Sequence, residues 1–333
     1  MNARERLERI LAGERPDRPA VSLWRHFYHR ESNADDLVAA MVEFQREYQW
    51  DFMKINPRAS YHVEDWGNTL AWSSDENTKH TKLTYAVNEL DDWSKIQKLP
   101  TSSPVLRAHR DVVWKIRKAV GPDLPLFMTV FNPISVASYL APSPEIFRDH
   151  LNRDKEAVLG AIARIAATYL DYVRELRDAG ADGIFLATTS WAARSSLTLA
   201  EYQELARPFD LALLAATDNE GFNIWHVCES DNYLTDLLDY PARLVNWDES
   251  HPANLSLRDA FDVVGDKTVI GGIDHLGWLQ TAEPAEIDFK VREMAVLFRG
   301  RRLIFGPGCT ISPQTPAANI AALRRAVETL TRR

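Results

Sequence analysis

Short apolar runs alternate with longer amphipathic segments along most of this chain. The runs are rich in β-branched and aromatic residues, which is typical of buried strands. We expect eight strands, at Ala20–Trp24, Asp51–Ile55, Leu124–Val130, Gly183–Ala187, Phe222–Val227, Arg243–Trp247, Thr268–Ile273 and Leu303–Phe305. The segments between them carry apolar residues at helical spacing, for example Glu156–Ala179, Leu199–Asn219 and Ala285–Phe298.

This alternation of strand and helix is the pattern of βαβ units and predicts a parallel sheet. Eight such units in a chain of 333 residues favour the α/β class and a closed (β/α)₈ TIM barrel, with a doubly wound open sheet as the alternative. No low-complexity tract or linker rich in Pro, Gly and Ser divides the chain. We therefore expect a single domain over residues 1–333.

A long polar and aromatic segment, residues 60–100, separates the second and third expected strands. Its aromatic residues are Tyr61, Trp66, Trp72, Tyr85 and Trp93. We expect an inserted cap or hairpin over one end of the barrel. An ordinary surface insertion is the alternative, because only some long loops close over a site.

The composition narrows the class of partner and the compartment. The net charge is -8 and no basic run offsets it, which argues against a nucleic-acid partner. No stretch approaches 18 consecutive apolar residues, and the charged start Met1–Arg6 lacks the features of a signal peptide. We expect a cytoplasmic protein without membrane contact, whose two cysteines are reduced thiols.

Both cysteines lie where a metal ion could use them. His226 and Cys228 form a His-x-Cys motif at the end of the fifth expected strand, and Cys309 follows the eighth. Barrel enzymes place their chemistry at this end of the strands. One His and two Cys are the ligands of a catalytic zinc that keeps its fourth position open. A closed structural zinc, with His251 or His275 as fourth ligand, is the alternative, although such sites usually gather ligands from short knuckles.

Three acidic residues sit near the same strand ends. Asp248 follows the sixth strand and Asp274 the seventh, and Glu229 is adjacent to Cys228. They are candidates for catalytic roles, with Glu229 also a candidate fourth ligand or outer base. The alternatives are a helix N-cap or loop turn for Asp248 and Asp274, and a solvated loop acid for Glu229.

Basic residues follow the first expected strand. Arg25, His26, His29 and Arg30 are candidates for binding a sulfonate or carboxylate of the substrate, since guanidinium groups bind such anions in bidentate fashion. Some of them are equally compatible with a solvent-facing position. His62, from the segment 60–100, is a further candidate for the lining of a pocket.

Over nearly its whole length the chain resembles the uroporphyrinogen decarboxylase superfamily. The resemblance rests on five segments: 5–19, Ala179–Gly183, Ser190–Ala192, Gly271–Asp274 and the closing Pro313–Asn319. It implies a (β/α)₈ barrel with its site at the carboxyl-end mouth. The superfamily includes metal-free decarboxylases and zinc-dependent thiol methyltransferases.

The decarboxylase pattern is incomplete in this chain. The family uses an arginine pair, an aspartate and a late histidine. Arg25 matches the first arginine, but the second falls near His29, Asn56 stands where the aspartate is expected, and Cys309 takes the place of the histidine. A metal-free decarboxylase remains the alternative activity.

Two further residues match the decarboxylase pattern. They are Tyr139, a candidate catalytic residue, and Ser190, a candidate substrate-binding residue. Either position is equally compatible with a role in the scaffold that both branches share.

The methyltransferase pattern is complete, since His226, Cys228 and Cys309 match the signature of corrinoid:thiol methyltransferases of the coenzyme M type. The resemblance implies Zn²⁺ and a substrate thiol that becomes a zinc thiolate and attacks a methyl group. No Asp-x-His-x-x-Gly corrinoid signature occurs, because Asp274-His275-Leu276-Gly277 has the wrong spacing. A methylcorrinoid donor would therefore come free or on a separate protein. The expected partners are a small thiol and a methyl donor, and a homodimer is compatible with the sequence.

Overall fold

The computed structural model describes residues 1–217 and 222–330. Its core is one parallel sheet of seven strands in the order β1-β4-β5-β6-β7-β8-β9. The strands are β1 Met53–Ile55, β4 Leu126–Phe131, β5 Gly183–Thr188, β6 Ile224–Val227, β7 Leu244–Trp247, β8 Thr268–Ile273 and β9 Leu303–Pro307. The α/β class and the parallel sheet agree with the prediction.

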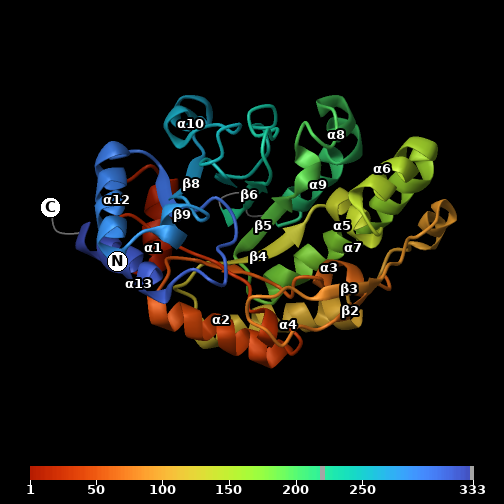
Figure 1. Cartoon of the computed structure of the whole chain (residues 1–333), viewed down its shortest axis with the longest axis horizontal. Helices are drawn as coiled ribbons and strands as arrows, with labels where there is room; N and C mark the ends of the chain where they lie inside the picture. The colour runs from red at the N-terminus through yellow and green to blue at the C-terminus, as the bar shows by residue number, and fades with distance from the viewer. Residues whose placement is uncertain (218–221, 331–333) are drawn as a thin grey trace.

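Helices connect most successive strands and pack around the sheet (Figure 1), whereas residues 228–243, between β6 and β7, contain none. The α-helices are α1 Ala3–Leu11, α2 Ala34–Tyr48, α3 Tyr61–Glu64, α4 Pro104–Val120, α5 Pro133–Leu140, α6 Pro144–Arg153, α7 Lys155–Asp178, α8 Leu199–Leu205, α9 Arg207–Ala215, α10 Leu257–Val263, α11 Trp278–Thr281, α12 Pro284–Leu297 and α13 Ala317–Thr329. Three short 3₁₀ helices, η1, η2 and η3, span Tyr28–Arg30, Leu90–Lys95 and Ser190–Ala192. None of the helices that the structure describes is long and apolar enough to cross a membrane.

One predicted helix is divided in two. The segment Leu199–Asn219 forms α8 and α9, which meet at Ala206. Pro208 stands in the first turn of α9, where its missing N–H costs nothing, whereas inside a continuous helix it would remove a hydrogen bond and clash with the preceding turn. The last two residues of the prediction lie outside the described residues.

The first expected strand, Ala20–Trp24, is not a strand in this structure. Val21 makes a single parallel bridge to Phe305 of β9, and the Ser22 amide donates to the Phe305 carbonyl over 3.0 Å. On the other side the Ser22 hydroxyl, not a backbone amide, donates to the Phe52 carbonyl. Beside β1, this side-chain bond and one backbone bond, from the Asp51 amide to the Val21 carbonyl at 3.0 Å, are present instead of a regular ladder. The described residues form seven of the eight expected strands. Residues 20–22 lie between β9 and β1, the two edge strands of the sheet, and we call this junction the seam.

A buried carboxylate holds this seam. Asp51 accepts hydrogen bonds from Arg6 at 2.6 Å, from Arg18 at 2.7 Å and from the Val21 amide at 2.8 Å. Arg6 belongs to α1, and Asp51 stands shortly before β1. One side chain therefore joins the first helix, the bridging segment and the start of the sheet.

Side chains alternate between the two faces of the sheet, and this alternation positions the polar site. The inner face carries an apolar layer made of Trp24, Phe52, Phe127, Phe185, Ala187, Ile224, Leu244, Ile270 and Ile304. Two residues further along a strand the side chain points to the same face. Lys54, His226 and Asn246 follow Phe52, Ile224 and Leu244 in this way. They therefore lie above the apolar layer, toward the carboxyl ends of the strands.

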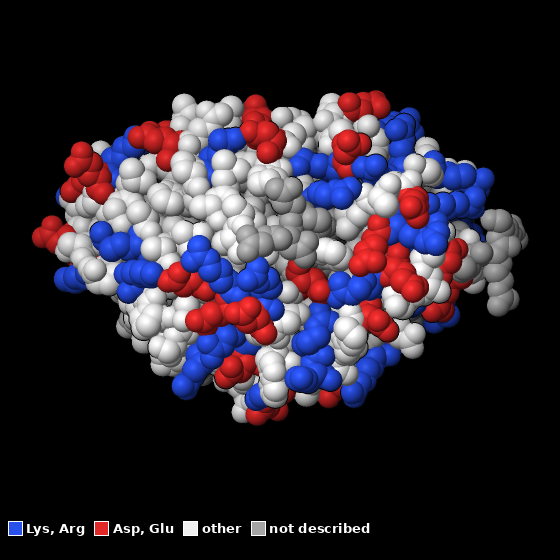
Figure 2. Space-filling view, turned by 180° about the vertical axis from the view of Figure 1, so that it is seen from behind, with Lys and Arg blue, Asp and Glu red and all other residues white. Residues whose placement is uncertain are grey.

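The segment 60–100 contains α3, a hairpin and η2. The hairpin pairs β2 Thr69–Ala71 with β3 Thr81–Thr84 in antiparallel fashion, with an irregularity at Thr69/Leu70. It lies at the opposite end of the molecule from α1, α12 and α13 (Figure 1). A hairpin is therefore present where one was expected. Basic and acidic side chains intermingle over the reverse face of the molecule (Figure 2).

Candidate metal centre

Three possible metal ligands meet above the inner face of the sheet. His226 lies on β6, Cys228 follows that strand and Cys309 follows β9. The His226 nitrogen and the two sulfur atoms all lie within 4.8 Å of one another, and no fourth His, Cys, Asp or Glu of the described residues joins the group. Three ligands without a fourth are typical of a catalytic metal site rather than a structural one. His251 and His275, the candidates for a closed site, are not part of it.

A glycine allows Cys309 to reach this position. A Cβ atom on Gly308 would lie 2.7 Å from the Cα atom of Asp248, closer than atoms of a folded chain approach. The loop after β9 therefore passes directly against the end of β7, and only glycine fits there.

The neighbouring strand determines which His226 nitrogen faces the sulfur atoms. The Asn246 side chain donates to the carbonyls of Ile270 at 2.9 Å and Pro307 at 3.0 Å, so its oxygen points the other way. This oxygen lies 2.7 Å from His226 Nδ1 and can only accept. In a neutral ring the proton is therefore on Nδ1. Nε2, 3.8 Å from Cys309 Sγ, keeps its lone pair for a metal ion.

The two thiols affect each other's ionisation. The contact with Cys309, together with burial, raises the pKa of Cys228 well above its usual value. The same contact with Cys228, assisted by His226, lowers the pKa of Cys309 well below its usual value. The pair thus favours one thiolate and one thiol when no cation is bound. A divalent metal ion would take both as thiolates, so this donor set fits zinc.

The group opens into a cavity of about 200 Å³. It is lined by Trp24, His26, Lys54, Asn56, Pro57, Arg58, Ala59, His62, Lys79, Lys82, Thr129, Phe131, Tyr139, Phe185, Ala187, Thr189, His226, Cys228, Cys309 and Thr310. Four of these residues are Lys or Arg and none is Asp or Glu, although the whole chain has a net charge of -8. The walls therefore favour an anionic ligand.

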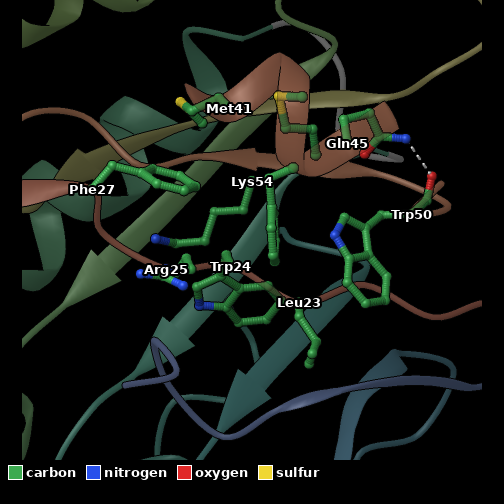
Figure 3. A pocket seen from close by; sticks show the side chains of 10 residues that line it. Leu23, Trp24, Arg25, Phe27, Met41, Gln45, Trp50 and Lys54 are labelled. Carbon is green, nitrogen blue, oxygen red and sulfur yellow. Dashed lines mark hydrogen bonds between the residues drawn. The ribbon is translucent and has the colours of Figure 1, made fainter. Parts of the chain in front are cut away.

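Lys54 brings a buried amine to the floor of this cavity. Its Nζ donates to Asn56 Oδ1 at 2.7 Å and lies 4.6 Å from the centre of the Phe185 ring. Figure 3 shows the side chain running above Trp24, whose ring centre is 5.9 Å from Nζ. Burial lowers the pKa of Lys54 to about 7, and the nearby Cys309 acts in the opposite sense.

His26 lines the cavity wall, and its imidazole contacts a buried carboxylate. His26 Nδ1 is 2.7 Å from Glu31, which also accepts from the Ala59 amide at 2.8 Å. His80, from the turn of the β2–β3 hairpin, is 3.3 Å from the same carboxylate. Burial alone would raise the pKa of Glu31, but these two imidazoles and the amide bring it well below its usual value.

Tyr139 lies in the opposite part of the lining, on α5. Its ring contacts that of His62, with centres 5.0 Å apart, and the Lys82 amine lies 4.8 Å from its centre. Burial raises the pKa of the Tyr139 hydroxyl, and Cys228 and Cys309 add to this effect. The hydroxyl is therefore a neutral donor near the two thiols.

Comparison with known proteins identifies the family of this chain. Residues 2–330 match the uroporphyrinogen decarboxylase (URO-D) family. The chain belongs to the uroporphyrinogen decarboxylase family. Two relatives, both methylcobamide:CoM methyltransferases MtaA of Methanosarcina barkeri, one from strain Fusaro / DSM 804, are each 26% identical over 212 and 215 residues. Each alignment covers 62% of this chain and 59% of the relative, so the chain spans less than two thirds of their length.

Solved structures share the fold of this URO-D family member. A methyltransferase from Methanosarcina mazei superposes with a TM-score of 0.85 at 17% identity, covering 99% of both chains. A B12-independent methionine synthase from Shewanella sp. W3-18-1, in complex with selenomethionine, gives 0.56 at 11% identity, covering 93% of this chain and 97% of that one. A putative vitamin-B12 independent methionine synthase from Listeria monocytogenes gives 0.58 at 15%, covering 94% and 95%.

The three candidate acids of this URO-D family member lie outside the cavity lining. Asp248 accepts from the Ser250 amide at 3.3 Å and Asp274 from the Gly277 amide at 2.7 Å, so both carboxylates stabilise loop turns. Glu229 is exposed, and its backbone adopts a left-handed conformation with φ of 67°. The sequence correctly placed these three residues next to the ends of strands. Their side chains, however, do not line the cavity.

Three of the candidate substrate-binding residues also lie away from the cavity. Arg25 pairs with Glu76, and Arg30 pairs with Glu43 at 2.6 Å. Ser190 begins η3, and its neighbour Thr189 lines the cavity instead. Of the four residues expected to bind substrate, only His26 is in the lining.

The basic lining residues Lys54, Lys79 and Lys82 and the orienting residue Asn246 were not predicted. Lys54 and Asn246 each left a signal, because a polar residue interrupts an otherwise apolar strand run at both positions. The two hairpin lysines left no such signal, since a polar loop normally carries lysines.

Proposed function

We propose that this chain is a zinc-dependent methyltransferase that moves a methyl group onto a thiol. The observation that carries the proposal is the His226–Cys228–Cys309 group in the lining of a cavity, with His226 Nδ1 against Asn246 and Nε2 left on the side of the sulfur atoms. The names of the two relatives and of the M. mazei structure support methyl transfer as the reaction class.

The chemistry follows from the ligand set. A bound zinc ion would lower the pKa of a substrate thiol, so that the acceptor reacts as a thiolate at neutral pH. His226, Cys228 and Cys309 would hold the ion, and Asn246 would keep the imidazole in the required tautomer. In the transfer a sulfur–carbon bond forms and the methyl–donor bond breaks. The donor keeps that electron pair, and the thiol proton goes to solvent.

The cavity walls suit a thiol with an anionic tail. Lys79 and Lys82 of the hairpin segment both line the cavity, whereas Arg58 is already paired with Glu64 at 2.9 Å. A carboxylate or sulfonate would therefore meet the hairpin lysines rather than Arg25 or Arg30. This supports the proposal that residues 60–100 form a cap that contributes to substrate binding.

A methylcorrinoid is the proposed donor, because both relatives are named as methylcobamide:CoM methyltransferases. It would arrive free or on a separate protein. A metal-free decarboxylase has less support, because Cys309 lies against a second cysteine and a histidine instead of acting alone. A structural zinc has less support, because structural sites have four protein ligands and this group has three.

Metal analysis tests the proposal directly. We expect about one zinc per chain in the wild type, and a new Zn–S scatterer in X-ray absorption when 2-mercaptoethanol is added. Cys228→Ser should weaken zinc binding more than about 100-fold, since it removes a ligand, while His251→Ala should leave it unchanged.

The proposal would be contradicted if the protein contained no zinc. It would also be contradicted if the coordination shell of the zinc did not change when 2-mercaptoethanol was added. Decarboxylation of uroporphyrinogen that survives Cys228→Ser would favour the alternative activity.

A further inference from the structure

Lys54 is a buried cation without an acidic partner. The residue is 6% exposed, and its ammonium has one amide oxygen and two aromatic ring faces around it. In the described part of the chain no carboxylate lies within 4.0 Å of this ammonium. Burying an unpaired charge is unfavourable by several kcal/mol, in order of magnitude. Such a residue is therefore retained at the expense of stability.

The position of this cation relates it to the metal ligands. Its ammonium lies 4.6 Å from the centre of the Phe185 ring, and the His226 ring lies 5.0 Å from the same ring. Lys54 also lines the cavity that Cys228 and Cys309 line. An anion that occupied the open position beside these ligands would thus share this cavity with the ammonium.

The charges of the proposed centre identify this anion. A divalent metal ion with two thiolates and a neutral imidazole has no net charge, and the imidazole of a metal-bound His226 would be neutral, with its proton on Nδ1 toward Asn246. A substrate thiolate adds one negative charge, and a protonated Lys54 adds one positive charge. We propose that Lys54 is the counter-charge for the acceptor thiolate, an inference that rests on the proposed function.

The same pairing favours product release. Once the sulfur has accepted the methyl group, the thioether is neutral and the attraction to Lys54 is lost. Lys54 therefore distinguishes substrate from product by charge, independently of the acceptor's tail. Its net effect is to strengthen the binding of the thiolate, and to leave the binding of neutral ligands at the open position unchanged.

Cobalt-substituted protein provides the test, because a thiolate on Co²⁺ gives visible charge-transfer absorption. Wild type and Lys54→Met would be titrated with 2-mercaptoethanol, which has no charged tail, with its S-methyl thioether, and with imidazole as a neutral ligand. We expect Lys54→Met to weaken thiol binding about tenfold or more, with thioether and imidazole affinities changed less than about twofold. Lys54→Gln, which keeps a donor for Asn56, should show the same loss.

A second measurement separates this role from a structural one. Metal-free Lys54→Met should be at least as resistant to urea as the wild type, because the substitution removes a buried charge. A lysine that merely supported the fold would give a less stable variant. Lys79→Met, which changes a lysine in another part of the same lining, serves as the matched control and should change the affinity for 2-mercaptoethanol much less than Lys54→Met.

The possible failures are distinguishable. If wild-type protein binds cobalt but no thiol, the proposed function fails. If wild type and Lys54→Met bind 2-mercaptoethanol equally, only the inference about Lys54 is wrong. It is also wrong if Lys79→Met weakens 2-mercaptoethanol binding as much as Lys54→Met does, since Lys54 would then act only through the overall charge of the cavity. If Lys54→Met weakens only the binding of thiols with anionic tails, Lys54 acts on the tail, and the inference is again wrong.

Discussion

Asn246 shows how one side chain can determine the chemistry of its neighbour. It stands opposite His226 in the register of β6 and β7, and its amide group is committed to two backbone carbonyls. Its oxygen therefore fixes the proton on His226 Nδ1. The ligand nitrogen of His226 depends on a residue that touches no metal.

We expect Asn246→Ala to weaken zinc binding about 10- to 100-fold, because the imidazole loses the partner that holds its tautomer and orientation. Competition with a chromogenic chelator measures the affinity. Asn319→Ala is a matched control, since Asn319 is also a buried asparagine that donates to two carbonyls, at 3.0 and 2.9 Å. Equal zinc affinities in the two variants would show that Asn246 acts only on the fold.

Among single residues, the sequence located the three candidate ligands but not the residues that surround them. His226, Cys228 and Cys309 could be found because their residue types are rare and lie at predicted strand ends. The roles of Asn246 and Lys54 depend on register across strands, which a single sequence does not specify. The side chains of Asp248 and Asp274 could not be oriented either, because a turn and a catalytic acid use the same residue type.

Among the elements, the β2–β3 hairpin has a specific connection to the cavity. Glu31 joins His26 of the wall to His80 of the hairpin segment, and Arg25 pairs with Glu76 of the same segment. The polar composition of 60–100 predicted a hairpin but not these contacts, because they bring together groups about 50 residues apart. A displacement of the hairpin would therefore move His26 as well as Lys79 and Lys82.

The Glu31 carboxylate should contribute stability that depends on pH. Its pKa is held below the ordinary value of 4.5, so the contribution is present above about pH 4.5 and is lost as pH falls. We expect Glu31→Gln to lower the free energy of unfolding by about 3 kcal/mol at pH 7, with a smaller difference at pH 4. Urea denaturation at both values measures this.

Glu43→Gln is the control for Glu31→Gln, since Glu43 is an exposed partner of Arg30 and its substitution should change stability much less. A Glu31→Gln deficit that stayed constant between pH 7 and pH 4 would mean that packing, not charge, is responsible.

For the whole molecule, the strand pattern predicted seven of the strands and the parallel order but not the seam. The expected strand Ala20–Trp24 has a strand-like composition, yet it forms one bridge, because Ser22 uses its side chain where a backbone ladder was expected. Periodicity reports which residues are buried, not which backbone groups pair. The seam depends instead on Asp51 and the arginines around it.

We expect Asp51→Asn to lower the free energy of unfolding by about 3–5 kcal/mol, because Arg18 would remain buried without a carboxylate partner and Arg6 would keep only its pair with Asp17. Thermal and urea unfolding of the full chain measure the change. Asp35→Asn, at an exposed residue that pairs with Lys115, should stay within about 0.5 kcal/mol of wild type. A small effect at Asp51 would mean that the bridge of Val21 holds the seam by itself.

The separation of the two cysteines has a consequence for biosynthesis. Cys309 follows the last strand, so a nascent chain that ends before it carries only His226 and Cys228. Such a chain offers two ligands, too few for a stable zinc site. The proposed centre would therefore hold a metal ion with all three ligands only after Cys309 has been made. A chain that ends before Cys309 should retain zinc less well than a chain that includes it.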